Sequence, residues 1–135
     1  MPKYQFQVEV TPAYLPQQSA PEAGVFSFSY TITVRNTGEV AAQLVSRHWH
    51  ISDALGHTHE VKGLGVVGEQ PLLHPGEAFQ YSSGCQLRTP SGTMHGIFHC
   101  VADDGEGFDC PISLFMLEAT NAEAPDQPLS ARVLH

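Results

Sequence analysis

The chain has 135 residues, of which six are basic, fourteen are acidic and 41% are hydrophobic. This length suffices for one domain with a hydrophobic core of its own. The formal net charge of -8 means that the electrostatic field of the whole molecule repels nucleic acids and anionic membranes. We therefore expect a globular protein that binds no nucleic acid unaided.

The chain carries no pattern typical of secretion or membrane insertion. Met1 to Tyr4 does not resemble a secretory signal, and no apolar run approaches the ~20 residues that a transmembrane helix requires. Cys85, Cys100 and Cys110 are odd in number and lack C-x-x-C spacing, which favours reduced thiols over a disulfide framework. We expect a cytoplasmic protein without membrane insertion, with Cys100 and Cys110 in the core and Cys85 more exposed beside a turn.

Alternation of apolar and polar residues predicts strands along most of the chain. The clearest strand is Phe26 to Arg35, which a turn at Asn36 to Glu39 ends. Further strands are expected at about residues 4–11, 42–52, 58–62, 77–82, 95–102 and 108–117, separated by turns rich in proline and glycine. About seven short strands at this spacing, with no sustained helical stripe, predict an all-β sandwich.

Two segments are predicted to be irregular. Pro12 to Pro21 contains three prolines and is expected to form an extended surface connection, with Tyr14 and Leu15 pinning it to the sandwich. The end of the chain has little hydrophobic content, so we expect a β-sandwich domain over residues 1–120 and a flexible tail over residues 121–135.

Gly63, Gly65 and Gly68 have the spacing of a dinucleotide-binding fingerprint. The helix that this fingerprint requires is excluded, because Pro71 and Pro75 follow closely. A glycine-rich loop between strands remains. Its backbone amides could form a nest for an anion, with Arg47 and Lys62 supplying positive potential, or the glycines could only allow a tight connection.

His48, His50, His57 and His59 flank a turn at Asp53 to Gly56. If that turn is a four-residue hairpin loop, His50 pairs with His59 and all four histidines share one sheet face. The facing pair would then lie close enough to bind one Zn²⁺, Ni²⁺ or Co²⁺ ion. A solvated face that happens to carry histidines is the alternative.

Further motifs flank the glycine-rich loop in a fixed order. They are Ser46-Arg47-His48-Trp49, Asp53-Ala54-Leu55-Gly56, Pro75-Gly76-Glu77-Ala78-Phe79-Gln80-Tyr81, Ser83-Gly84, the run from Leu87 to Gly96, and Phe108-Asp109. Together these motifs resemble the ApaG family, also called CorD, over about residues 8–117. Of the four histidines, the family pattern includes only His48.

The resemblance implies an immunoglobulin-like or fibronectin-III-like β-sandwich without enzymatic activity, found alone in bacteria and appended to some eukaryotic F-box and polymerase-interacting proteins. The family names imply a context of dinucleoside-polyphosphate hydrolysis, cobalt tolerance and magnesium efflux, but no mechanism.

Two functions follow as hypotheses. The first is a non-catalytic binding module that engages a protein partner or a phosphorylated small molecule through Gly63, Gly65, Gly68, Arg47 and Lys62. The second is divalent-cation binding, or support of cobalt and magnesium homeostasis, through His48, His50, His57 and His59. We expect no enzyme and no cofactor other than a divalent metal, because Asp103-Asp104 is predicted to be an acidic turn and no nucleophile has a local partner.

Overall fold

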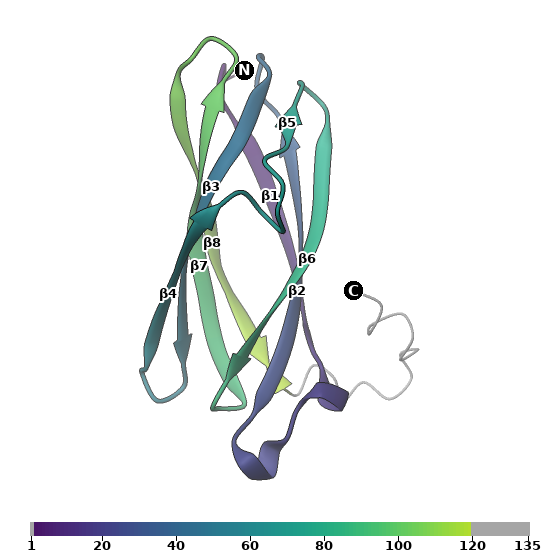
Figure 1. The fold of residues 1–135 in the computed structure, drawn as a ribbon, viewed down its shortest axis with the longest axis vertical. Coiled ribbons are helices and arrows are strands. Elements are labelled where there is room, and N and C mark those ends of the chain that lie inside the picture. The colour runs from purple at the N-terminus through teal and green to yellow at the C-terminus, as the bar shows by residue number, and fades with distance from the viewer. Residues whose placement is uncertain (1, 120–135) are drawn as a thin grey trace.

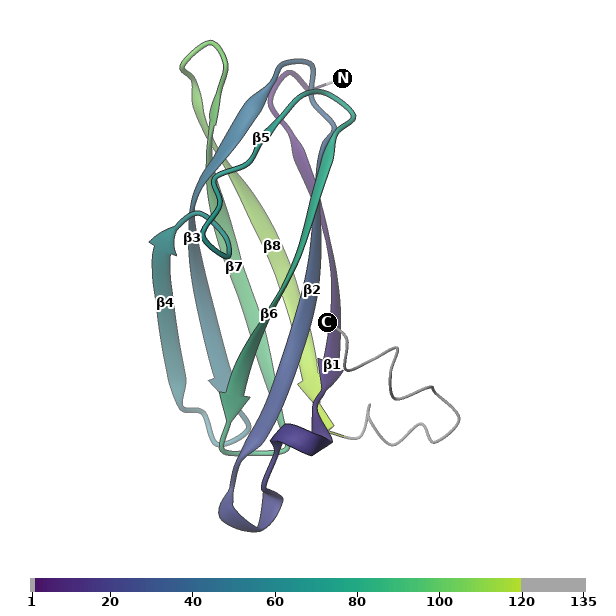
Figure 2. The ribbon, with the colours of Figure 1, turned by 45° about the vertical axis from the view of Figure 1, so that its right-hand side comes forward.

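The protein is a sandwich of two antiparallel sheets, described for residues 2–119 by a computed structural model. One sheet has the strand order β1-β2-β6, and the other has the order β4-β3-β7-β8 with the short β5 paired to β3. Figures 1 and 2 show the two layers face to face. The strands are β1 (Phe6–Tyr14), β2 (Phe26–Asn36), β3 (Ala42–Asp53), β4 (Thr58–Leu64), β5 (Leu72–Leu73), β6 (Ala78–Leu87), β7 (Ser91–Ala102) and β8 (Gly107–Glu118). The all-β sandwich prediction is confirmed.

The core lies between the sheets and follows the alternation of each strand. On β2 the inward side chains of Phe28, Tyr30 and Ile32 are buried. Trp49 of β3 is 2% exposed and lies edge-on to Tyr30, with ring centroids 5.5 Å apart. Burial of one large side chain of this kind contributes about 1.5–3 kcal/mol to stability, so the strand alternation itself fixes which face of each strand is inside.

The proline-rich segment differs from its prediction at both ends. β1 continues to Tyr14 and so includes Pro12. β1 is an edge strand that pairs only with β2. An edge strand tolerates proline, because a residue whose N–H would point away from the sheet needs no backbone donor. The chain then forms two short 3-10 helices, η1 (Pro16–Gln18) and η2 (Pro21–Ala23). Tyr14 is buried 5.4 Å from the Phe28 ring, which confirms its predicted anchoring role.

The same segment changes the outward face of β2. The alternation of side chains along β2 places Ser27 and Ser29 on the face away from the core, where polar side chains usually meet solvent, but both are buried. Ser27 Oγ donates to the Gln18 carbonyl at 2.8 Å, and Ser27 N donates to Ser19 Oγ at 2.9 Å. The folded-back segment therefore covers the start of β2 and supplies its hydroxyl and amide with partners.

β6 and β7 extend well beyond the predicted ranges 77–82 and 95–102, and this corrects the position of Cys85 relative to the turn between them. β6 runs to Leu87 and β7 begins at Ser91, so Cys85 lies within β6 and not beside a turn. It is half-buried and, as predicted, more exposed than the other two cysteines. Cys100 and Cys110 are buried free thiols, as predicted. Each has its pKa raised by burial, to about 12 for Cys100 and about 11 for Cys110.

The predicted boundary between the domain of residues 1–120 and the tail of residues 121–135 lies outside the described residues. Within residues 2–119, no helix has the length and hydrophobicity needed to cross a bilayer.

Candidate functional site

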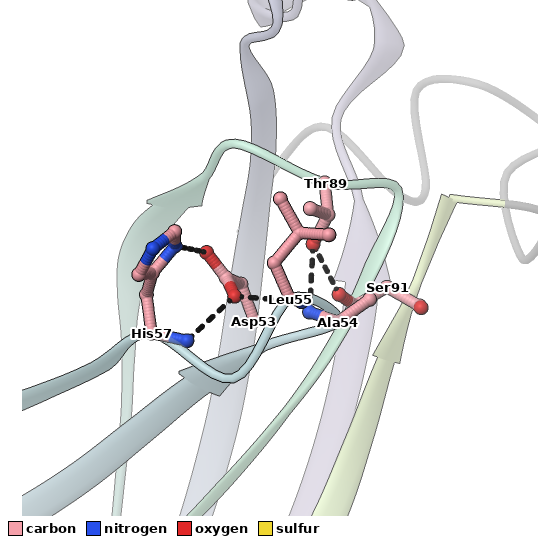
Figure 3. A network of polar contacts seen from close by, with 6 residues as sticks. All are labelled: Asp53, Ala54, Leu55, His57, Thr89 and Ser91. Carbon is pink, nitrogen blue, oxygen red and sulfur yellow. Dashed lines mark hydrogen bonds and ion pairs between the residues drawn. The ribbon is translucent and has the colours of Figure 1, made fainter.

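The hairpin between β3 and β4 sets the geometry of every candidate residue. Asp53 N donates to the His57 carbonyl at 3.0 Å, and Gly56 has a φ of 86°. These are features of a three-residue loop with glycine in the left-handed position. The Asp53 carboxylate accepts hydrogen bonds from the backbone N–H groups of Leu55 and His57 inside this loop (Figure 3).

The prediction of a four-residue loop and of a shared histidine face is therefore wrong. The observed register pairs His50 with Glu60, His48 with Lys62 and Ile51 with His59. Because side chains alternate along a strand, a shift of one residue moves every side chain of β4 to the other face. His48 and His50 lie on the outer face of the sheet, whereas His57 and His59 face the other sheet.

A cleft of about 510 Å³ opens between the edge of the five-stranded sheet at β4 and the edge of the three-stranded sheet at β6. We call it the inter-sheet cleft. Its apolar lining includes Tyr30, Trp49, Ile51, Val61 and Leu87. Its polar lining includes Arg47, Asp53, His57, His59, Ser83, Cys85 and Arg88.

The lining of the inter-sheet cleft is more positive than the molecule around it. Arg47 and Arg88 contribute two guanidinium groups, and Asp53 contributes the one carboxylate. Burial alone would raise the pKa of Asp53, but the hydrogen bonds from the His57 and Leu55 amides outweigh it and hold the pKa below its usual value. The Asp53 charge is thus stabilised within the hairpin loop.

Two phenols and a thiol near the cleft are held in their protonated forms. Burial raises the pKa of Tyr30 and of Tyr81, and it raises the pKa of Cys85 to about 11. The Tyr81 hydroxyl is buried without a hydrogen-bond partner among residues 2–119. At neutral pH Cys85 is therefore a thiol and a weak nucleophile, while Tyr81 retains an unused donor.

Arg47 lies directly against the glycine-rich loop. Its Nη1 donates to the carbonyls of Leu64 at 3.1 Å and Gly65 at 2.8 Å. Gly63 faces Arg47 across the β3–β4 pair, and a Cβ at Gly63 would lie 2.8 Å from Arg47 Nη1. The absence of a side chain at residue 63 therefore makes room for the guanidinium.

The loop itself ends in a tight two-residue turn at Val67 and Gly68, which have φ values of 44° and 83°. Val66 and Glu69 exchange both backbone hydrogen bonds across this turn, and Gly65 N donates to the Val45 carbonyl. A Cβ at Gly65 would collide with the Glu69 carbonyl. This geometry supports the interpretation as a tight connection, because three loop amides already donate to backbone carbonyls.

The residues predicted to hold an anion are brought together only in part. Arg47, Lys62 and Gly63 line a second, shallower hollow of about 420 Å³, with Ser46, His48, Leu64 and His99. Gly65 and Gly68 are not part of its lining. Lys62 lies on the outer face, opposite His48, and does not line the inter-sheet cleft.

The outer face holds further titratable residues that the sequence analysis missed. His50 pairs with His95 of β7, and their rings stack at 4.9 Å with an interplanar angle of 14°. His99 Nδ1 lies 2.7 Å from Asp109 Oδ1. The alternation of His95 and His99 along one strand was visible in the sequence, but nothing local indicated that β7 pairs with β3.

Comparison with known proteins gives the family. The pattern of the ApaG domain matches residues 16–102. Protein ApaG of Acidovorax sp. (strain JS42) is 70% identical over 137 residues, covering 100% of both chains, and Protein ApaG of Thiobacillus denitrificans (strain ATCC 25259 / T1) is 59% identical, covering 85% of this chain and 91% of its own. A crystal structure from Bordetella pertussis superposes with a TM-score of 0.85 at 51% identity, covering 87% of this chain and 95% of that chain. With this match in sequence and fold, the chain belongs to the ApaG family.

Proposed function

We propose that this ApaG-family protein is a non-catalytic binding module whose inter-sheet cleft takes a phosphorylated small molecule. The proposal rests on the net positive charge of the groups that line the cleft. Two arginines and one engaged carboxylate line it, in a chain whose net charge is -8. A local positive potential of this kind favours an anion that the rest of the surface repels.

Arg47 has donors left for such a ligand. A guanidinium carries five N–H donors in a planar fork that suits phosphate oxygens. Only Nη1 of Arg47 is engaged by the carbonyls of Leu64 and Gly65 among the described residues. The loop therefore holds the guanidinium in place while its remaining N–H groups stay available, which lowers the entropy lost on binding.

The size and lining of the cleft support a small molecule with an apolar part. Its volume of about 510 Å³ falls within the range of about 300–1,000 Å³ that is typical of ligand sites. Tyr30, Trp49 and Leu87 supply an apolar wall beside the arginines. A nucleotide or another phosphorylated aromatic compound combines these two requirements.

The absence of catalysis is part of the proposal and rests on the state of the candidate groups. The Cys85 thiol is protonated at neutral pH because burial raises its pKa to about 11. Asp104 of the acidic turn accepts a hydrogen bond from the Tyr4 hydroxyl at 2.6 Å and lies 3.4 Å from Lys3 Nζ. Through these contacts Asp104 ties the start of the chain to the turn between β7 and β8.

Trp49 allows a direct test, because it is the only tryptophan of the chain and it lines the cleft. Titration with pyrophosphate and with ATP should change its fluorescence in a saturable manner. Arg88→Gln should weaken binding at least about tenfold, since a hydrogen bond to a charged group contributes about 1.5–3 kcal/mol and each 1.4 kcal/mol is a factor of about ten. Lys62→Gln is the matched control, because Lys62 lies outside the cleft. Unchanged binding by Arg88→Gln and Arg47→Gln would contradict the proposal.

A second candidate, contact with a protein partner at the glycine-rich loop, is favoured by Val67. Among the described residues, Val67 is the one non-glycine residue with positive φ, and its side chain is 54% exposed. A β-branched residue is strained in this backbone conformation. A strained residue with an exposed apolar side chain is a candidate contact for a protein partner. Affinity capture from the source cell should retain a partner with the wild-type chain and lose it with Val67→Asn, a change that keeps the turn.

A further inference from the structure

The outer face of the β3–β4 hairpin gathers two imidazoles around one carboxylate. Glu60 Oε2 lies 3.5 Å from His50 Nδ1 and 3.7 Å from His48 Nε2. One nitrogen from each histidine and one oxygen of Glu60 all lie within 4.8 Å of one another. The observed register produces this group, because it places Glu60 opposite His50. We propose that His48, His50 and Glu60 form a binding site for a divalent transition-metal ion of the Zn²⁺ or Ni²⁺ class.

The state of His48 gives independent support. Its Nε2 is buried and has no hydrogen-bond partner among the described residues. A buried polar atom without a partner has lost its hydrogen bond to water and gained none in return, which destabilises the fold. Bound metal would supply the missing partner, since the lone pair of a neutral imidazole nitrogen is a metal ligand.

The distances are close to those that coordination requires. Zn²⁺ lies about 2.0–2.2 Å from imidazole nitrogen and carboxylate oxygen, so ligand atoms in a tetrahedral site are about 3.4 Å apart. The two contacts of Glu60 already have nearly this separation. The rings of His48 and His50 have centroids 4.5 Å apart, so small side-chain rotations bring the three ligands together.

The donor set decides which ion is accepted. Two imidazoles and one carboxylate suit Zn²⁺, Ni²⁺ and Cu²⁺ better than Mg²⁺ or Ca²⁺, which prefer sites made of oxygen alone. Three protein ligands leave a fourth position for water. His95, stacked on His50, restricts the orientation of that ring.

The surrounding charges act in both directions. Lys62 of β4 faces His48 on the same side of the sheet and opposes a bound cation. On β7 and β8, the pair of His99 and Asp109 lies on the same face, and the net charge of -8 attracts cations to the molecule as a whole. Lys62→Gln should therefore tighten metal binding by about threefold, by removal of one nearby positive charge.

Calorimetric titration of the untagged full chain with Zn²⁺ and with Ni²⁺ tests the site. We expect one ion per chain at about pH 7.5 and weaker binding at about pH 5, where protons compete for imidazole nitrogen. His50→Gln and Glu60→Gln should each weaken binding at least about tenfold, and they should remove the rise in melting temperature that Zn²⁺ gives the wild-type chain.

His59→Gln is the matched control, because His59 is next to Glu60 in the chain but on the opposite face of the sheet. It should bind Zn²⁺ like the wild-type chain. Circular dichroism of each variant shows whether the sandwich is intact, and the paired use of His50→Gln and Glu60→Gln keeps the test decisive if one variant fails to fold. Wild-type affinity in both variants, or loss of binding in His59→Gln alone, would overturn the assignment.

Discussion

Arg47 and Gly63 act as one packing unit at the edge of the sandwich. The guanidinium lies where a side chain at residue 63 would be, and it donates to the carbonyls of Leu64 and Gly65. Sterics at Gly63 and Gly65 thus account for two of the three glycines without any ligand. Gly68 differs, because it faces open space and needs glycine only for its φ of 83°.

Val67 and Gly68 occupy the two central positions of a turn, and both have positive φ. Positive φ at both central positions defines a type I′ turn, for which Asn-Gly is the preferred pair. Val67→Asn should therefore raise the unfolding free energy by about 1 kcal/mol, because asparagine tolerates the left-handed region. Thermal unfolding followed by circular dichroism measures this. Val67→Ala is the control, since alanine shortens the side chain but, unlike asparagine, does not favour the left-handed region. A lower melting temperature for Val67→Asn would contradict the turn assignment.

At the scale of the element, the β3–β4 hairpin depends on Asp53. Its pKa is lowered in the folded state, so the stability that its charge contributes is present above the unfolded pKa and is lost as the pH falls through the folded pKa. Asp53→Ala should lower the melting temperature at about pH 7, and the difference from the wild-type chain should shrink as the pH falls below the unfolded pKa of about 3.9. A difference of equal size at both pH values would show that the charge is not involved.

Local sequence signals predicted the two strands of this hairpin but not their register. Alternation predicted both strands, and Gly56 at the last loop position was a local signal for a three-residue loop. The predicted loop included Asp53, whereas Asp53 pairs with His57 in the structure. The predicted β3–β4 register was therefore off by one residue, and His57 and His59 were assigned to the outer face and not to the inner one. The inter-sheet cleft was beyond local reasoning, because β6 approaches β4 only through packing of the two sheets.

At the scale of the whole molecule, the two proposed sites lie on opposite faces of one sheet. The inter-sheet cleft faces β6, and His48, His50 and Glu60 face outward. Two arginines against the single carboxylate of Asp53 favour an anion on the inside, while two imidazoles and Glu60 favour a cation on the outside. The failure of one site therefore leaves the other untouched, and the variants Arg88→Gln and His50→Gln separate them.

We propose that the inter-sheet cleft, and not the glycine-rich loop, receives the phosphorylated ligand. The most direct test is a ¹H–¹⁵N NMR titration of the full chain with ATP. We expect saturable shifts of the Trp49 indole N–H and of the amides of Cys85 and Arg88, which line the cleft, with little change at Val67 and Gly68. Shifts confined to the amides of residues 65–69 would contradict it.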